Sequence, residues 1–319
     1  MPVTCRFKSP DDYLPGPPEK AILHPASGAA TVAQASSGPG DSCKETETSM
    51  QVIGICRFSY PGLGGFQIQH DSLQDRIDYL YAPERLEERF RFFECITLPG
   101  IRAQFDPDFT FLVVIGESLP RNHRERLQAL VADIPQVVIQ SHPPGRHRVV
   151  MQDAINSVRQ KGSEPCLQFR LDDDDAVAFS YVHKLRRAAN DVAGLLRENR
   201  HIAIDFNQGY IARPGPAGIA AKPIQTPYWT AGLALMFRPN VSMSVMNFGH
   251  HSVCKSMPTV TFTGEDMMLR GHNDYNDSRQ GPGIKPVRLT PLDADGELLF
   301  QMTYGIDTDH VRRVFSAPL

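Results

Sequence analysis

Four consecutive aspartates, Asp172 to Asp175, are the residues of this chain whose type and spacing most clearly suggest chemistry. Carboxylates this close repel one another, which costs stability unless a cation or solvent screens them. Hard divalent cations take oxygen ligands and often share them with phosphate groups. The alternative is a solvated acidic turn that caps a helix beginning near Ala176, but a helix cap needs only one aspartate. The run therefore favours a divalent metal site.

The segment before the aspartates predicts how they are positioned. In LQFRL, residues 167–171, Leu167, Phe169 and Leu171 alternate with Gln168 and Arg170. This alternation predicts a strand with one buried face. The aspartates then follow the carboxyl end of that strand, and ligands of open α/β sheets bind at this end.

Strands and helices are expected to alternate from residue 50 onward. We predict strands over 52–58, 109–115, 136–139 and 167–171, and helices from Pro83, over 124–131 and over 149–160. The run FTFLVVI is typical of a strand buried on both faces of a parallel sheet. The pattern predicts an α/β fold with a mixed, mostly parallel central sheet flanked by helices.

The regular alternation of strands and helices ends in the second part of the chain. We predict a helix from Ala176 to about Arg197, then two strands, 201–206 and 209–213, joined in a hairpin through Asn207-Gln208-Gly209. A strand over 229–237, a helix over 241–254, a strand over 259–262 and a capped helix over 307–315 complete the expected elements.

The first 49 residues differ from the rest of the chain. They include the stretch ASGAATVAQASSGPG and have almost no periodic apolar pattern, which predicts disorder. They are either a native tail or linker, or residues that precede a natural start at Met50. Residues 50–319 are expected to form one domain, with a nucleotide-binding half over 50–175 and an acceptor-side half over 176–319.

Composition excludes several classes of protein. A net charge of −3 gives no electrostatic argument for binding nucleic acid. The six cysteines form no CxxC pair, which argues against a zinc ribbon or a disulfide framework and favours the reducing cytoplasm. No apolar run approaches the roughly 18 residues of a membrane span, and the first residues lack a signal-peptide pattern. We expect a soluble, cytoplasmic protein, with peripheral membrane contact left open.

Four segments together resemble a known enzyme family. CRFSYPGLGGF, FRLDDDDAV, FNQGYIARPG and RGHNDYNDS are similar to the rhamnosyl transferase family, whose fold is of the GT-A type. The resemblance implies a DxD motif that holds Mn²⁺ or Mg²⁺ against the diphosphate of a nucleotide sugar. It also implies transfer of a sugar such as rhamnose from that donor to a saccharide or lipid-linked acceptor.

The resemblance assigns roles within the acidic run. Alternate residues of an extended segment point the same way, so Asp173 and Asp175 are the predicted metal ligands, and Asp172 or Asp174 would bond to donor hydroxyls. His272, in a loop rich in oxygen and nitrogen groups, is the predicted third ligand; the alternative is an exposed histidine in a polar turn. His250 and His251, which lie between the aspartates and His272 in the chain, are further candidates.

Two more segments complete the predicted site. Gly264-Glu265-Asp266 resembles the motif that supplies the base of inverting enzymes, with Asp266 as first and Glu265 as second candidate to deprotonate the acceptor. The alternative is a helix N-terminus with acidic residues near its positive end.

The glycine-rich loop after the first strand is predicted to lie near the nucleotide. There Gly64 and Gly65 would let the backbone approach the ligand, and Arg57 would pair with phosphate. Arg170 either contacts the donor or pairs with the aspartates that follow it.

Two other functions use the same residues. A nucleotidyltransferase, or another metal-dependent enzyme that handles phosphate, would need a basic glycine loop near the N-terminus, and Arg57 alone barely supplies one. A non-catalytic sugar-binding protein is the other alternative. A calcium-binding EF-hand is excluded, because DDDDAVAFSYVH lacks the glycine and the glutamate that such a loop requires at its sixth and twelfth positions.

Overall fold

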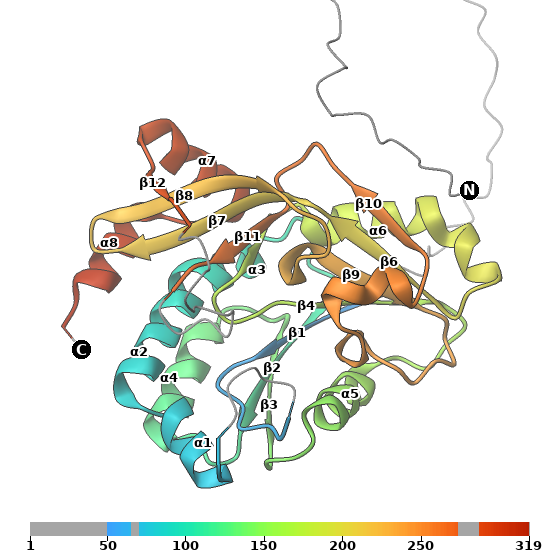
Figure 1. Ribbon diagram of the computed structural model, residues 1–319, viewed down its shortest axis with the longest axis horizontal. Helices are drawn as coiled ribbons and strands as arrows, with labels where there is room; N and C mark the ends of the chain where they lie inside the picture. The colour runs from blue at the N-terminus through green and yellow to red at the C-terminus, as the bar shows by residue number, and fades with distance from the viewer. Residues whose placement is uncertain (1–49, 65–69, 274–286, 319) are drawn as a thin grey trace, which may run out of the picture. The chain divides into compact units, whose positions relative to one another are not determined.

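The apolar segments of the first half form the parallel part of a seven-stranded sheet (Figure 1). In the computed structural model, which describes residues 50–64, 70–273 and 287–318, β1 (Gln51–Arg57) pairs with β2 (Thr110–Gly116) and with β4 (Cys166–Arg170). Beyond β2 lies β3 (Val137–His142). All three of these pairings are parallel, so the carboxyl ends of the four strands meet at one edge.

Strands from the second half complete the same sheet. β9 (Leu233–Phe237) pairs antiparallel with β4 and with β6 (His201–Phe206), and β10 (Thr259–Phe262) pairs parallel with β6. The predicted fold class, a mixed and mostly parallel sheet flanked by helices, is confirmed. Contacts define one compact unit over Thr48–Leu319, and the predicted N-terminal extension, residues 1–49, lies outside the described residues.

Helices cover both faces of this sheet. One face carries α2 (Pro83–Phe92), which continues through a π-helical turn into α3 (Leu98–Arg102), together with α4 (Arg121–Val131) and α6 (Tyr181–Val192). The other face carries α5 (His147–Val158). The short α1 (Leu73–Leu80), which was not predicted, precedes α2.

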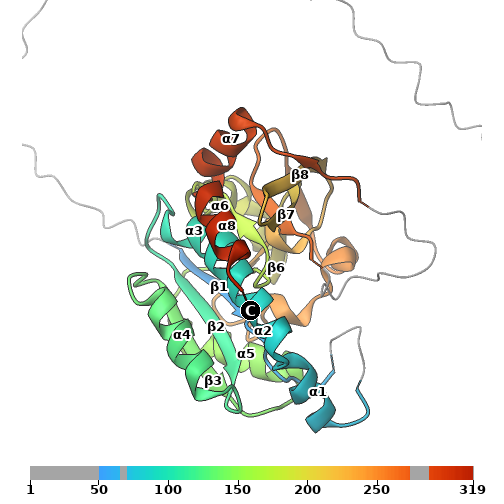
Figure 2. The same ribbon diagram turned by 90° about the vertical axis from the view of Figure 1, so that its left-hand side faces the viewer.

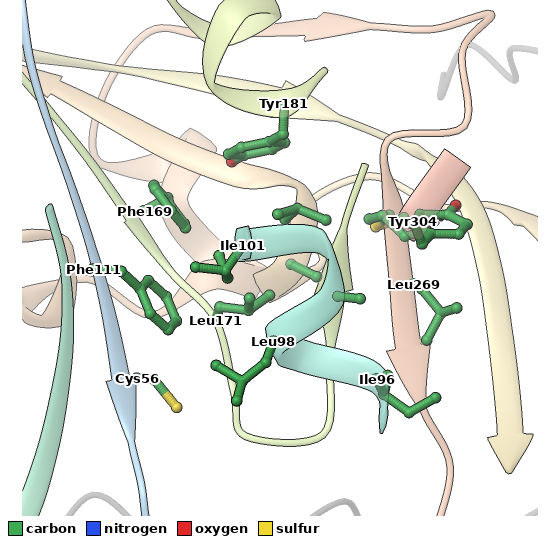
Figure 3. Packing of buried hydrophobic residues seen from close by; sticks show 14 of the residues in the cluster. Cys56, Ile96, Leu98, Ile101, Phe111, Phe169, Leu171, Tyr181, Leu269 and Tyr304 are labelled. Atoms are coloured by element: carbon green, nitrogen blue, oxygen red, sulfur yellow. Dashed lines mark hydrogen bonds between the residues drawn. The ribbon is translucent and has the colours of Figure 1, made fainter. Parts of the chain in front are cut away.

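Two apolar clusters fill the space between the sheet and these helices. Along β1, Val52 and Cys56 belong to the cluster under α2 and α4, whereas Ile53 and Ile55 belong to the cluster under α5. Figure 3 shows part of the first cluster, in which the rings of Phe111 and Phe169 have centroids 6.2 Å apart. Alternate side chains of one strand therefore serve two cores, as expected for a strand buried on both faces.

A second, five-stranded sheet lies beside the first. Its order is β12-β8-β7-β11-β5, and α8 packs on β7 and β8 (Figure 2). The ranges of its strands and of the last two helices are β5 Ala176–Val177, β7 Gln208–Gly215, β8 Gly218–Gln225, β11 Met268–Gly271, β12 Thr290–Pro291, α7 Ala294–Tyr304 and α8 Thr308–Ser316. The terminal helix was predicted, and its cap is Asp307.

The predicted hairpin through Asn207 is wrong. β6 belongs to the central sheet and β7 to the second sheet, so the turn between them carries the chain from one sheet to the other. The partner of β7 is β8, a strand that was not predicted because Pro223 and the small residues around it weaken the pattern. Turn-forming residues mark a change of direction but do not specify which strands pair.

Two predicted helices also differ from the structure. Residues 241–254 form two short 3₁₀ turns, Val245–Asn247 and His250–Lys255, in place of one α-helix. A capping box between Ser244 and Asn247 begins the first turn, which is only three residues long. The helix expected from Ala176 begins only at Tyr181, because Ala176 and Val177 form β5 and pair with β11.

The aspartate run therefore lies between two sheets. It follows β4 of the central sheet and leads directly into β5 of the second sheet. The alternative in which the run caps a helix at Ala176 is wrong, since no helix begins there.

Candidate active site

A cavity of about 590 Å³ opens at the carboxyl ends of β1 and β4, and we call it the central cavity. Two parts of the chain contribute most of its lining. We call the lining residues between Arg57 and Asp175 the charged wall, and those between Trp229 and His251 the aromatic wall. Arg270 of β11 also lines the cavity.

The charged wall contains many ionisable side chains. All four aspartates line it, and the arginines of the whole cavity number seven: Arg57, Arg76, Arg85, Arg89, Arg148, Arg170 and Arg270. Arginine therefore exceeds aspartate by three among the described lining residues, although the whole chain has a net charge of −3. A concave surface with excess positive charge attracts anions.

Asp172 lies between two arginines. Arg57 Nη2 donates to its Oδ1 over 3.1 Å, and Arg170 Nη2 lies 3.3 Å from its Oδ2. Partial burial opposes ionisation, but the charges of Arg170 and Arg57 outweigh it and hold the pKa of Asp172 below its usual range. The side chain of Asp172 is 33% exposed, so an ionised carboxylate faces the cavity.

Asp173 and Asp174 share one arginine from helix α2. Arg89 Nη1 lies 2.9 Å from Asp173 Oδ1 and 3.1 Å from Asp174 Oδ2, and all three side chains are at least 91% buried. Burial, with Arg89 acting against it and Asp174 adding to it, raises the pKa of Asp173 to about 6. Asp174 also accepts a hydrogen bond of 2.7 Å from Asn273 Nδ2.

Asp175 is held by the second sheet. Its Oδ1 accepts the backbone N–H of Gly271 at 3.0 Å, and burial together with Asp174 and Asp172 raises its pKa well above the usual value. A Cβ at position 271 would lie 2.1 Å from the Asp174 carbonyl oxygen, so only glycine allows β11 to approach the run this closely.

His147 is a neutral partner of the charged wall that was not predicted. It begins α5, and its backbone N–H donates to the Leu63 carbonyl at 3.0 Å, which ties it to the glycine-rich loop. Arg57 Nη1 lies 3.2 Å from His147 Nε2. Burial, together with the charges of Arg57 and Arg170, lowers the pKa of His147 to about 3, so the ring accepts this hydrogen bond as a neutral imidazole.

Other residues of the charged wall were also not predicted. Arg85 and Arg89 lie four residues apart on α2 and are both buried, so they share one face of that helix. Arg85 Nη1 donates to Ser59 Oγ at 3.1 Å and to the Leu80 carbonyl at 3.0 Å. The i, i+4 spacing was visible in the sequence, but charged residues on a helix are usually exposed.

The structure does not bring the predicted base into the central cavity. Glu265 lies in a separate pocket of about 170 Å³, where its Oε1 pairs with Lys184 Nζ at 2.7 Å. Asp266 Oδ1 accepts a hydrogen bond from Gln208 Nε2 at 3.0 Å. Neither carboxylate lines the cavity, and no helix begins at this motif.

Only some of the remaining predicted site residues line the central cavity. Arg57 and Arg170 line the cavity, as do His250 and His251, but His272 does not. The backbone N–H of His272 donates to the Ala212 carbonyl at 2.8 Å. Gly64 is exposed at φ 73° and does not line the cavity, whereas Gly65 and residues 274–278 lie outside the described residues.

Within the described residues, no three His, Cys, Asp or Glu side chains form a cluster that could by itself hold a metal ion. The predicted ligands Asp173, Asp175 and His272 therefore do not make a closed metal site. The oxygen donors of the aspartate run still suit Mn²⁺ or Mg²⁺, because such ions bind through one or two carboxylates when phosphate and water supply the other ligands.

The sequence of the chain matches a known protein family. Residues 51–285 match the sequence family described as "Putative rhamnosyl transferase", a match over well more than half of the chain. The protein belongs to this rhamnosyl transferase family. The resemblance predicted from its four segments is confirmed. No curated protein matches it by sequence.

Solved structures resemble the chain at low sequence identity. S. aureus TarS, residues 1–349, aligns with a TM-score of 0.39 at 8% identity in its complex with UDP-GlcNAc, over 72% of this chain and 60% of that one. Its complex with UDP aligns with a TM-score of 0.39 at 9% identity, over 70% and 61%. A "putative nucleotide-diphospho-sugar transferase" from Desulfovibrio desulfuricans G20 aligns with a TM-score of 0.30 at 9% identity, over 71% and 82%. The chain thus spans about 60% of the length of the TarS fragment.

Two observations bear on the expected cytoplasmic location, the state of the cysteines and the length of the apolar helices. Cys56, Cys95 and Cys166 are buried free thiols. In the described part of the chain, no helix is both long and apolar enough to cross a bilayer. A cytoplasmic location stays a prediction.

Proposed function

We propose that the central cavity binds the nucleotide diphosphate of a sugar donor, and that the protein transfers the sugar, with rhamnose as the family's candidate, to a saccharide or lipid-linked acceptor. The observation that carries this proposal is the excess of arginine at the carboxyl ends of β1 and β4. A diphosphate is the most strongly anionic part of a nucleotide sugar, and guanidinium groups bind its oxygens through paired hydrogen bonds.

Two buried donors of the charged wall support a phosphate ligand. The Nε atoms of Arg85 and Arg170 are buried without a hydrogen-bond partner in the described structure. A buried donor that makes no hydrogen bond costs stability. Both atoms have almost no accessible surface, so a phosphate oxygen would accept these hydrogen bonds only if the two guanidinium groups turned toward the cavity on binding.

Asp172 is the proposed contact to donor hydroxyls. Its carboxylate is ionised and faces the cavity between Arg57 and Arg170. An ionised carboxylate only accepts hydrogen bonds, and ribose and sugar hydroxyls donate them. Asp174, the other predicted contact, already pairs with Arg89 and Asn273, so its proposed role is to hold the shape of the run.

A divalent ion is part of the proposal, with Asp173 and Asp175 as its carboxylates; His272, their predicted companion, lies outside the lining of the cavity. When bound, Mn²⁺ or Mg²⁺ would neutralise charge on the leaving diphosphate. Arg57, Arg170 and the other arginines of the cavity supply positive charge for the same purpose from the protein itself.

The experiment that tests this proposal is turnover of dTDP-rhamnose and UDP-sugars by the full chain, with Mn²⁺ or Mg²⁺ added. We expect metal-stimulated release of the nucleoside diphosphate, strongly reduced in Arg170→Ala. The matched control is Arg121→Ala, because the Arg121 side chain is 91% exposed on α4. Release of pyrophosphate from nucleoside triphosphates, without sugar transfer, would favour a nucleotidyltransferase instead.

The acceptor base requires its own variants. If Asp266 deprotonates the acceptor, Asp266→Asn will abolish transfer and leave nucleotide affinity unchanged; Glu265→Gln is the parallel test of the second candidate. If both variants transfer sugar at the wild-type rate, neither carboxylate is the base. That result would agree with their positions outside the central cavity.

A further inference from the structure

The aromatic wall differs from the charged wall in its chemistry. Its lining residues include no carboxylate, lysine or arginine in the described structure, and its rings are Trp229, Phe248, His250 and His251. Burial lowers the pKa of His250 to about 4, so this ring is neutral at neutral pH. A surface of this kind suits an uncharged ligand with an apolar face.

Trp229 is the largest ring of this wall, and Arg270 lies over it. The Arg270 guanidinium carbon lies 5.0 Å from the centroid of the indole ring, which is within the range of a cation–π contact. Arg270 is itself fixed by strand β11, which pairs with β7. The ring also packs against the cluster that includes Phe206 and Met268. Its position is therefore set by several elements.

The residue before Trp229 has a strained backbone. Tyr228 has φ 64°, in the left-handed region that side chains larger than glycine's rarely adopt. Such strain persists only where surrounding contacts enforce it, and it is concentrated at functional sites. In the described chain only Ser59 shares this property, and Ser59 also lines the cavity.

Two hydrogen bonds enforce the strained turn. Asp205 Oδ1 accepts the Tyr228 backbone N–H at 3.0 Å, and His250 Nδ1 donates to the Tyr228 carbonyl at 2.7 Å. Asp205 is completely buried at the end of β6 and also accepts a hydrogen bond from Thr261 Oγ1 at 3.1 Å. A buried carboxylate is thus used to fix the backbone of a turn that precedes the tryptophan.

We infer that Trp229 is the stacking surface for a pyranose ring of the acceptor, and that Asp205 and His250 are positioning residues for it. The apolar C–H face of a pyranose would pack on the indole, and its hydroxyls would face the polar groups beside it. This inference rests on the proposed function, because the charged wall is assigned to the donor and leaves the uncharged wall for the acceptor sugar.

The chain offers a direct probe, because Trp229 is its only tryptophan. The full chain is titrated with a panel of methyl pyranosides, including the rhamnoside, glucoside, galactoside, mannoside and N-acetylglucosaminide, with and without UDP. We expect at least one pyranoside to shift Trp229 emission with saturation and to protect the indole from acrylamide quenching. By calorimetry, Trp229→Leu should weaken binding of that pyranoside by roughly tenfold, and Trp229→Phe should weaken it less.

The positioning roles have a separate readout. Asp205→Ala should weaken pyranoside binding and increase acrylamide quenching of Trp229, whereas Asp205→Asn, which keeps an acceptor for the Tyr228 N–H, should restore both. Unchanged quenching and affinity in Asp205→Ala would show that Asp205 does not position the tryptophan.

Failure of this inference can be told apart from failure of the proposed function. If UDP binds but no pyranoside shifts Trp229 emission, the acceptor surface is wrong and the donor site stands. A shift with UDP-GlcNAc but with no methyl pyranoside would assign Trp229 to the donor sugar and overturn the inference. If a pyranoside stacks on Trp229 but neither UDP nor dTDP binds, the inference stands and the donor proposal fails.

Discussion

The two walls of the central cavity are built in different ways. The charged wall consists mainly of residues at strand ends and on helices, where a parallel sheet brings carboxyl ends together. Its ion pairs join β1 and α2 to the aspartates after β4, and a hydrogen bond joins Arg57 to the neutral His147 of α5. The aromatic wall consists of short 3₁₀ turns and a strained turn before β9. The first wall takes its geometry from the sheet, and the second from a few local hydrogen bonds.

Of the two described non-glycine residues with positive φ, Ser59 belongs to the charged wall and Tyr228 directly precedes the aromatic wall, and each is held by a different kind of contact. Arg85 donates to the hydroxyl of Ser59 in the charged wall, whereas Asp205 and His250 bind the backbone of Tyr228 beside the aromatic wall. Mutations that remove one set of contacts should therefore affect one wall and leave the other in place.

The largest expected effect is on the charged wall. Arg89→Ala would leave Asp173 and Asp174 buried without their shared cation, which should lower the free energy of unfolding by about 3 to 5 kcal/mol. Urea denaturation followed by circular dichroism measures this change. The exposed control Arg121→Ala should stay within about 0.5 kcal/mol of the wild type. A loss below about 1 kcal/mol in Arg89→Ala would contradict the pairing described here.

A smaller effect is expected where the two sheets meet. Gly271→Ala would place a Cβ against the Asp174 carbonyl oxygen, so the run and β11 must separate, at a cost of about 1 to 3 kcal/mol. Nucleotide affinity should fall with stability, since the aspartates shift. Gly162→Ala is the control, because a Cβ added at that position would have no atom within 4 Å. Equal stability of the two variants would argue against the close approach.

The smallest effect is expected next to the aromatic wall and depends on pH. Burial, opposed by the hydrogen bonds from Tyr228 and Thr261, raises the pKa of Asp205 from 3.8 to about 6. A carboxyl whose pKa is higher in the folded than in the unfolded chain stabilises the fold when it is protonated. The stabilisation from protonating Asp205 is therefore fully present below pH 3.8 and is lost as the pH rises to about 6. Among the described residues, the titratable groups that interact with Asp205 are the hydroxyls of Tyr181 and Tyr228.

Comparison with Asp205→Asn isolates this effect. As the pH falls from about 7 to about 4, the wild type should gain stability relative to the variant, which has no carboxyl to protonate. Urea denaturation of both proteins across this range measures the difference. A constant difference would show that Asp205 does not titrate in the folded protein with a raised pKa.

The sequence predicted the charged wall better than the aromatic wall. Alternation in LQFRL and the apolar run FTFLVVI define strands locally, and the position of the aspartates follows from the strand that precedes them. The partner of Asp173 and Asp174 could not be predicted, because Arg89 lies 84 residues from Asp173 in the chain and reaches it only through tertiary packing.

The aromatic wall could not be predicted for a related reason. Residues 241–254 contain apolar residues that suggest a helix, but the segment forms only short 3₁₀ turns, and the buried side chains of Val245 and Val253 fill the cluster under α5. Nothing in the sequence indicates that Asp205 at the end of β6 would bind the backbone of Tyr228. The predicted base failed to reach the cavity because Gly264 to Asp266 lead into β11 of the second sheet.

The central claim is that the charged wall binds the diphosphate of a nucleotide sugar, and calorimetric titration with UDP and dTDP tests it most directly. We predict that the wild type and Arg121→Ala bind one of these nucleotides alike, and that Arg170→Ala binds it about 10- to 100-fold more weakly, because a hydrogen bond to a charged group is lost. Equal affinity of Arg170→Ala and Arg121→Ala, or no binding of either nucleotide to the wild type with Mn²⁺ or Mg²⁺ present, would contradict the account.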